Sequence, residues 1–196
     1  MNAFIVLLVL AVIVLLWLAL IYNRLVTCRN RYENAFSQID VQLKRRHDLI
    51  PNLVQTVREY LQYEKETLTE ITAARARATA AVAGAAARPG DPALMRELAG
   101  AEQALTAGLG RLAVTVEKYP DLKASATVTR LMEDLTSTEN RVAFARQAYN
   151  DAVMVYNTAC QTVPEVLVAG PLGFRPAAPF MIEDAAQREA PRVAAL

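Results

Sequence analysis

The residues that could perform chemistry gather in one short segment, Lys44-Arg45-Arg46-His47-Asp48. His47 is the only histidine in the sequence, and with Asp48 it forms the kind of imidazole and carboxylate pair that is used in acid-base catalysis. No serine or cysteine stands in a nucleophile motif, and the sequence has no Gly-rich phosphate loop and no paired-histidine metal spacing. We therefore expect no enzyme, no catalytic residue, no cofactor and no metal site.

The cysteine pattern and the net charge indicate which binding sites and partners are not expected. The two cysteines, Cys28 and Cys160, lie far apart and neither belongs to a C-x-x-C pair, so the pattern does not indicate a zinc site or a disulfide framework. The 21 basic and 20 acidic residues leave a formal net charge of +1, without the basic surplus that is typical of nucleic-acid binding. We expect no nucleic-acid partner.

The rest of the chain must position the segment that contains His47. Near its start the chain has an apolar run from Ala3 to Ile21 (AFIVLLVLAVIVLLWLALI). At 1.5 Å per residue, a helix of this length spans about 28 Å, close to the thickness of the bilayer's hydrocarbon core. Residues 1–22 are therefore predicted to be a transmembrane anchor, with Trp17 and Tyr22 near one interface. The alternative is a cleaved signal peptide, which usually has a basic segment before the apolar run and a small-residue cleavage site after it.

Basic residues follow the predicted span, whereas Met1-Asn2 before it contribute no basic side chain. By the positive-inside rule, the short N-terminus lies outside and the rest of the protein is cytoplasmic, at the inner membrane of a bacterium. Arg24, Arg29 and Arg31 are juxtamembrane, where each basic residue can contribute about 1 kcal/mol of attraction to anionic lipid. The lipid bilayer is the first predicted partner.

Helical periodicity continues beyond the span. Apolar residues at three- and four-residue spacings predict helices over residues 22–50, 52–86, 92–119 and 122–162, with no Gly or Pro between the span and the first of them. Pro51 is predicted to break or kink the chain, and in the turn at residues 88–92, Asp91 is predicted to cap a helix that begins at Pro92. Tyr149 and Tyr156 are expected in the core or at its rim, and polar residues such as Asn150 are expected to set the helix register.

Long helices joined by short turns bury their apolar stripes best when they are antiparallel. The predicted fold is all-α, with an N-terminal transmembrane helix that continues into an up-down-up-down antiparallel four-helix bundle over residues 23–163. A Pro-rich apolar C-terminal tail follows over residues 164–196, and four prolines between residues 164 and 179 prevent it from forming a second span. The tail either packs along its own bundle or contacts the membrane or another subunit, and residues 183–196 are expected to be disordered.

Two segments could bind a partner protein. The first is the corner formed by Arg45, Arg46, His47, Asp48 and Pro51, where the alternative is a set of salt bridges within the bundle. The second is the apolar tail, with Leu172, Phe174 and Phe180 as its bulky members.

Several blocks of the sequence resemble the LemA family. They are YNRLVTCRNRYENAFSQIDVQLKRRHDLIPNLVQTV (residues 22–57), EKETL (64–68), YPDLKA (119–124), TENRVAFARQAYNDAVMVYN (138–157) and GFRPAAPFM (173–181). The resemblance implies a membrane-anchored bacterial helical bundle with its short N-terminus outside and its bundle in the cytoplasm. It implies no agreed catalytic activity. Some relatives resemble partners of membrane proteases or participants in the organisation of internal membranes.

These observations lead to three hypotheses of function. The first is a membrane-anchored scaffold that assembles into a homo-oligomer. The second is an adaptor or regulator of another membrane protein, such as a membrane protease, that docks through the corner around Arg45. The third is a hydrolase or metal enzyme that uses His47.

Overall fold

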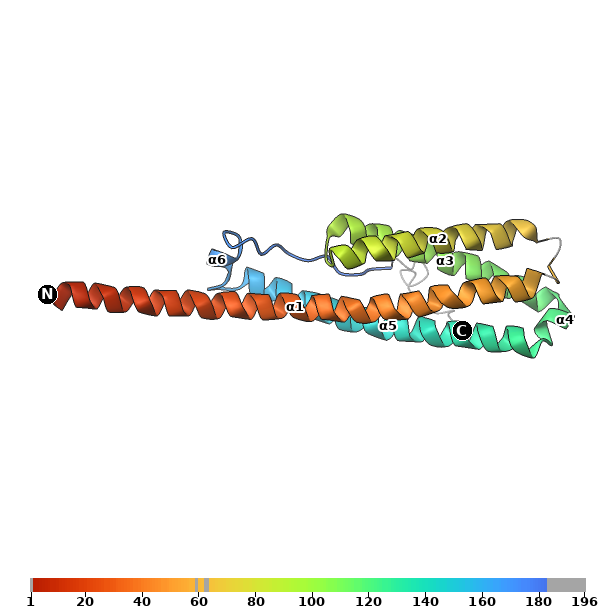
Figure 1. Ribbon diagram of the computed structural model, residues 1–196, viewed down its shortest axis with the longest axis horizontal. Coiled ribbons are helices and arrows are strands. Elements are labelled where there is room, and N and C mark those ends of the chain that lie inside the picture. Colours follow the sequence, from red (N-terminus) through yellow and green to blue (C-terminus); the bar gives the residue numbers. More distant parts are fainter. Residues whose placement is uncertain (1, 59, 62–63, 183–196) are drawn as a thin grey trace, which may run out of the picture.

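Figure 1 shows the computed structural model of the chain, which describes residues 2–58, 60–61 and 64–182. Within those ranges the regular elements are helices and no strand is present, which confirms the all-α prediction. The helices are α1 (Asn2–Arg58), α2 (Lys65–Ala87), α3 (Pro92–Lys118), α4 (Pro120–Lys123), α5 (Ala126–Gln161) and α6 (Val166–Ala169). The predicted disorder of residues 183–196 lies outside the described residues.

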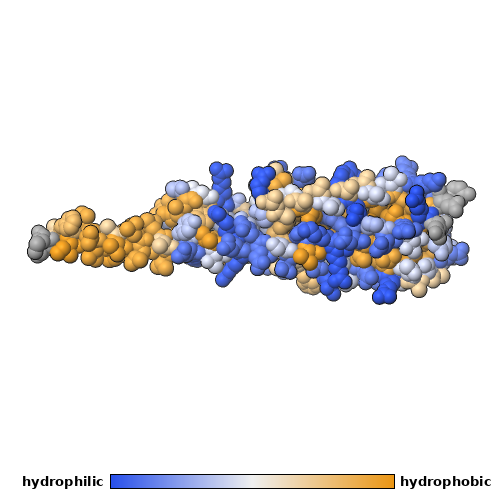
Figure 2. Space-filling view, viewed as in Figure 1, coloured by the Kyte–Doolittle hydropathy of each residue, from blue (hydrophilic) through white to orange (hydrophobic). Residues whose placement is uncertain are grey.

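The first helix, α1, has an exposed N-terminal part and a packed C-terminal part. Its N-terminal part projects alone from the molecule, and Figure 2 shows it as a rod of apolar side chains, with Phe4 71% and Leu20 69% exposed. Of the helices described, it is the one long and apolar enough to cross a membrane. From Ile21 onward one stripe of the same helix is buried: Ile21, Leu25, Cys28, Tyr32, Phe36, Ile39 and Leu43. The predicted continuity between the span and the first packed helix is therefore confirmed.

Of the break or kink predicted at Pro51, the break is wrong, because α1 continues through this residue to Arg58 and α2 begins at Lys65 instead of near residue 52. Proline lacks an N–H group, so it leaves the carbonyl four residues earlier, that of His47, without its usual helical donor. In the structure the Arg75 side chain on α2 supplies this donor, with Nε 2.7 Å from the His47 carbonyl oxygen. A tertiary contact thus satisfies the group that the proline leaves unpaired, and the helix persists.

The long helices pack in pairs (Figure 1). α5 lies antiparallel to α1. The Tyr32 ring contacts the Tyr156 ring with centroids 5.0 Å apart, whereas Phe36, further along α1, meets Tyr149, earlier on α5, at 5.7 Å. α2 packs on both α1 and α3. The fourth predicted helix, over residues 122–162, is divided into α4 and α5.

The turn between α2 and α3 follows its prediction. The Asp91 carboxylate accepts hydrogen bonds from the backbone N–H groups of Ala93 and Leu94 at 2.9 and 3.2 Å, and Pro92 is the first helical residue. These bonds lower the pKa of Asp91, because they stabilise its charged form. Gly90 in the same turn has a φ of +86°, a backbone conformation that favours glycine.

Two apolar clusters fill the space between the helices. The near cluster, on the side of the span, includes Leu25, Tyr32, Phe36, Leu43, Leu98, Val142, Tyr149, Tyr156, Phe174 and Phe180. The far cluster includes Ile50, Leu53, Val57, Leu61, Leu68, Ile71, Leu105, Leu112, Leu122, Val128 and Leu135. On α1 the near cluster ends at Leu43 and the far cluster begins at Ile50, so polar residues can occupy the level between them.

Candidate functional site

Polar residues from three helices meet between the two clusters. Arg46 and His47 on α1 and Glu102 on α3 are all buried, at 3%, 2% and 0% exposed. One oxygen of the Glu102 carboxylate lies 2.7 Å from His47 Nε2, and the other accepts a hydrogen bond from Arg46 Nη1 at 3.1 Å. With Arg75, Thr79 and Thr106, these residues form what we call the polar hub.

The remaining hub contacts fix the histidine. A carboxylate can only accept, so His47 Nε2 carries a hydrogen toward Glu102, while Nδ1 lies 3.3 Å from the Thr79 hydroxyl on α2. Arg46 Nη2 donates to the Thr106 hydroxyl at 2.9 Å. The Thr79 hydroxyl donates its hydrogen to the Arg75 carbonyl oxygen at 2.9 Å, so His47 is held by its bond to Glu102 and by burial against Thr79. The hub instead ties α1, α2 and α3 together at one level.

The predicted interaction corner is therefore divided by the structure. Arg46 and His47 point into the hub and are buried, whereas Arg45, Asp48 and Pro51 are exposed. The only ion pair of Asp48 among the described residues is a 3.9 Å contact with Arg75 Nη2. A partner at this corner would meet the exposed residues and leave the hub covered.

Residues 174–182 of the apolar tail lie along the protein's own helices, as one of the predicted alternatives had it. Phe174 and Phe180 are 4% and 0% exposed and belong to the near cluster, whereas Leu172 is 46% exposed. Residues of α5 hold the extended backbone between them. The Tyr156 and Tyr149 hydroxyls donate to the carbonyl oxygens of Arg175 and Ala178, at 2.9 and 2.8 Å.

Two asparagines complete this contact, which we call the tail clamp. Asn157 accepts from the Ala177 N–H at 2.8 Å and donates to the Ala177 carbonyl at 2.9 Å. Asn150 does the same for Phe180, at 2.8 and 3.2 Å. The two Tyr-Asn pairs are seven residues apart on α5, which is a rise of about 10.5 Å along the helix. The tail residues that they bind are three apart, which is about 10 Å of extended chain, so the two spacings match. The tail therefore runs antiparallel to α5.

The predicted lipid-contacting residues lie where the exposed apolar rod of α1 meets the packed helices. Trp17 and Tyr22 are 42% and 47% exposed, and Tyr22 also meets Phe174 edge-on with ring centroids 5.7 Å apart. Arg24 forms an ion pair with Glu165, and the Arg29 guanidinium lies 4.4 Å from the centre of the Phe174 ring. Arg31 is exposed. The lipid role of these residues stays a prediction, and two of the three arginines also bind the tail.

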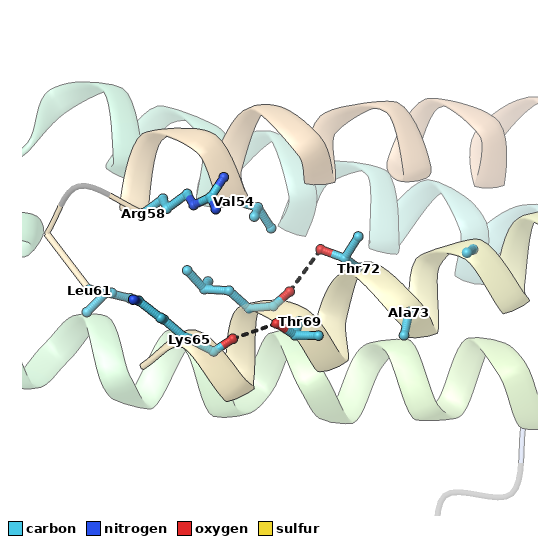
Figure 3. A pocket seen from close by; sticks show the side chains of 9 residues that line it. Val54, Arg58, Leu61, Lys65, Thr69, Thr72 and Ala73 are labelled. Atoms are coloured by element: carbon cyan, nitrogen blue, oxygen red, sulfur yellow. Dashed lines mark hydrogen bonds between the residues drawn. The ribbon is translucent and has the colours of Figure 1, made fainter. Parts of the chain in front are cut away.

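Figure 3 shows a groove at the far end, which the sequence did not predict. It has a volume of about 750 Å³ and is lined by residues of the α1 end, of α2 and of the segment between them, including Val54, Arg58, Lys65 and Thr69. The Thr69 and Thr72 hydroxyls donate to the backbone carbonyls of Lys65 and Leu68, both at 2.8 Å, so their donors are used within α2. The groove offers an apolar floor with two cationic side chains.

Sequence reasoning missed Glu102 and the tail clamp, although each has a recognisable signal. Glu102 follows Leu98 by four residues and precedes Leu105 by three, so it occupies a position on the buried stripe of α3. The clamp appears as the dipeptide Tyr-Asn repeated after seven residues, at 149–150 and 156–157. Tyr149 and Tyr156 are in the core as predicted, but Asn150 binds the tail instead of a neighbouring helix.

The chain is similar in sequence to two magnetosome proteins. The chain is 27% identical over 169 residues to the Magnetosome protein MamQ of Magnetospirillum gryphiswaldense, a match that covers 79% of this chain and 62% of that protein. It is 27% identical over 174 residues to the Magnetosome protein MamQ 2 of Paramagnetospirillum magneticum, covering 81% and 64%. The chain thus spans less than two thirds of the length of these relatives.

The family assignment rests on a separate match. The sequence profile described as the LemA family matches residues 35–194, which include the polar hub, the tail clamp and all helices after the first part of α1. The blocks that resemble this family in the sequence fall largely in the same range. The chain therefore belongs to the LemA family, whose members are associated with membranes.

Proposed function

We propose that this protein is a membrane-anchored helical scaffold that assembles with copies of itself at the bacterial inner membrane. The observation that carries the proposal is the continuity of α1. The exposed apolar rod and the buried stripe from Ile21 to Leu43 belong to one helix, so the anchor and the packed helices form one structural unit. Membership of the LemA family supports a place at a membrane.

The scaffold in this proposal is the up-down-up-down four-helix bundle predicted from the sequence. The antiparallel contacts of α1 with α5 and the packing of α2 on α1 and α3 support it. The exposed N-terminal rod and the basic residues that follow it support a single-pass topology, with the short N-terminus outside and the packed helices in the cytoplasm.

Self-assembly is proposed to use the outer face of α1 and α5. Phe144 is 74% exposed, Met154 62% and Val155 48%, although all three lie on a helix whose other side is in the core. In the register that pairs Phe36 with Tyr149, Val41 lies level with Phe144 and is 55% exposed. Large apolar side chains that are exposed on adjacent helices favour contact with another apolar surface.

The test is the mass of the particle in nanodiscs and in detergent, measured by light scattering. The native chain is expected to form a discrete oligomer, and Phe144→Lys is expected to lower its mass. Val114→Lys is the matched control, because Val114 is 56% exposed but lies on α3, away from this face. A native chain that stays monomeric at all concentrations, or a Phe144→Lys variant with unchanged mass, would contradict the proposal.

The adaptor role is a second candidate, which the exposure of Arg45, Asp48 and Pro51 supports. Its test is charge reversal at Arg45, with Lys123→Glu, also exposed, as the control on another helix. A membrane protein cross-linked at this corner in cells should be lost in Arg45→Glu and kept in Lys123→Glu. Arg46 is unsuitable for this test, since its replacement would disturb the polar hub.

A further inference from the structure

Residues 163–173, which include α6, form a short apolar projection that we call the α6 knuckle. It connects the end of α5 to the tail and lies beside the base of the exposed rod (Figure 1). Its outward side chains are apolar: Val163 is 78% exposed, Leu167 68%, Leu172 46% and Val166 43%. Four large apolar side chains exposed within ten residues favour contact with another apolar surface.

The position of the knuckle indicates which surface this is. Leu167, Val168, Pro171 and Leu172 share a shallow apolar cavity of about 400 Å³ with Leu18, Ala19, Tyr22 and Asn23 of α1. The knuckle is thus level with the last turns of the apolar run that ends at Ile21. Figure 2 shows apolar side chains continuing from the rod onto this part of the molecule. An apolar surface at this level is continuous with the one that faces the hydrocarbon core.

The electrostatics of the knuckle fit an apolar environment. Glu165 is the one charged residue between Val163 and Gly173. Its side chain is 3% exposed and forms an ion pair with Arg24, so the carboxylate is turned away from the outer surface and is neutralised. A free carboxylate at this level would oppose contact with lipid, because transfer of an unpaired charge out of water is unfavourable.

Most backbone N–H groups of the knuckle are hydrogen-bonded, as an apolar environment requires. The N–H groups of Val166, Leu167, Val168, Ala169, Leu172, Gly173 and Phe174 all donate to carbonyl oxygens between Thr162 and Gly170. Pro164 and Pro171 have no N–H group to satisfy. Irregular segments enter the membrane only where their polar backbone groups have partners, and this segment meets most of that requirement internally.

We propose that the α6 knuckle inserts its exposed apolar side chains into the bilayer interface beside the span, as a second membrane attachment. The inference rests on the proposed membrane anchor and extends it to a site remote in sequence. Through Glu165 and Arg24, and through Phe174 and Arg29, the inserted segment is connected to α1 itself. The base of the packed helices is thereby held against the bilayer surface.

The experiment uses tryptophan as a depth probe, because Trp17 is the only tryptophan in the chain. The full chain is reconstituted in vesicles of phosphatidylcholine and phosphatidylglycerol, with or without doxyl-labelled lipid as quencher. Three proteins are compared: the native chain with Trp17, a Trp17→Phe/Leu167→Trp variant, and a Trp17→Phe/Val114→Trp control on the far part of α3. Leu167 and Val114 are both exposed, so both substitutions should leave the fold intact, as checked by circular dichroism.

We expect the tryptophan at position 167 to show blue-shifted emission and quenching by shallow doxyl groups at least half as strong as that of Trp17, whereas the tryptophan at 114 is not quenched. Quenching of Trp17 without quenching at position 167 would overturn the inference and leave the anchor in place. Blue-shifted emission at 167 without quenching would also overturn it, since a protein surface would then cover the knuckle. Absence of quenching at both 17 and 167 would overturn the anchor as well.

Discussion

The near and far halves of the packed helices are stabilised in different ways. The near cluster contains the four rings of Tyr32, Phe36, Tyr149 and Tyr156, and the tail clamp covers it with directional hydrogen bonds. The far cluster consists mainly of aliphatic side chains, and grooves of about 750 and 590 Å³ border it. The near half is therefore held in one conformation by specific contacts, whereas the far half depends on aliphatic burial and has room to accommodate other groups.

The polar hub joins the near and far halves, so its removal should lower the stability of the protein more than any other change considered below. In Glu102→Ala, Arg46 and His47 lose their buried carboxylate, and we expect the free energy of unfolding to fall by about 3–5 kcal/mol. Urea unfolding of the detergent-solubilised protein measures the change. Glu97→Ala, at an exposed position of the same helix, should change stability by less than about 0.5 kcal/mol. Similar losses in the two variants would contradict the role assigned to the hub.

Glycine-to-alanine substitutions should change the stability of the protein in opposite directions in the near and far halves. A Cβ at Gly90 would lie 2.8 Å from the Ala177 Cβ and 3.3 Å from the Tyr32 ring, at a φ of +86°. We expect Gly90→Ala to lower stability by about 2–4 kcal/mol through backbone strain and overpacking against the tail. Gly110→Ala meets nothing within 4 Å and should raise stability by about 1 kcal/mol, because alanine favours the helix. Thermal unfolding distinguishes the two signs, and a stabilising Gly90→Ala would show that the tail does not pack here.

Loss of one clamp residue should loosen the near half alone. Asn157→Ala removes both hydrogen bonds to the Ala177 backbone, for an expected loss of about 1–3 kcal/mol. Hydrogen exchange should accelerate for amides of the tail and the C-terminal half of α5, while amides around Leu112 keep their rates. Gln147→Ala, exposed on the same helix, is the control. Equal acceleration in the far half would mean that the two halves do not respond separately.

Alkaline pH should weaken the near half gradually, which is the smallest effect. Burial raises the pKa of Tyr156 from its ordinary 10.0 to about 12 and also raises that of Tyr149. The unfolded chain therefore loses these protons first, so the stabilisation is complete below pH 10 and is lost as pH rises toward 12. Tyrosinate absorbance and circular dichroism, followed together, should show that these two residues ionise only as the near half opens. Ionisation near pH 10 with an intact fold would contradict their burial.

Local periodicity was sufficient to predict the helices and the apolar rod, since each depends on residues close in sequence. It was not sufficient at Pro51, where the Arg75 side chain, 24 residues further on, donates to the unpaired His47 carbonyl. The hub and the clamp depend on the same kind of remote partner. Glu102 lies on the apolar stripe of α3, and only its remote partner Arg46 explains a buried carboxylate there. The extended tail has no periodicity of its own that would identify Asn150 as its partner.

With α1 anchored as proposed, the uninterrupted helix also acts as a lever whose pivot is in the bilayer. Beyond Ile21 this helix continues for a further 37 residues to Arg58, about 55 Å at 1.5 Å per residue. Membrane helices commonly tilt by about 20°, and at that angle the far end of such a rod moves sideways by roughly 20 Å. In the proposed membrane-anchored state, a change in bilayer thickness of a few ångströms, which a membrane helix accommodates by tilting, is thereby converted into a much larger displacement of the far groove.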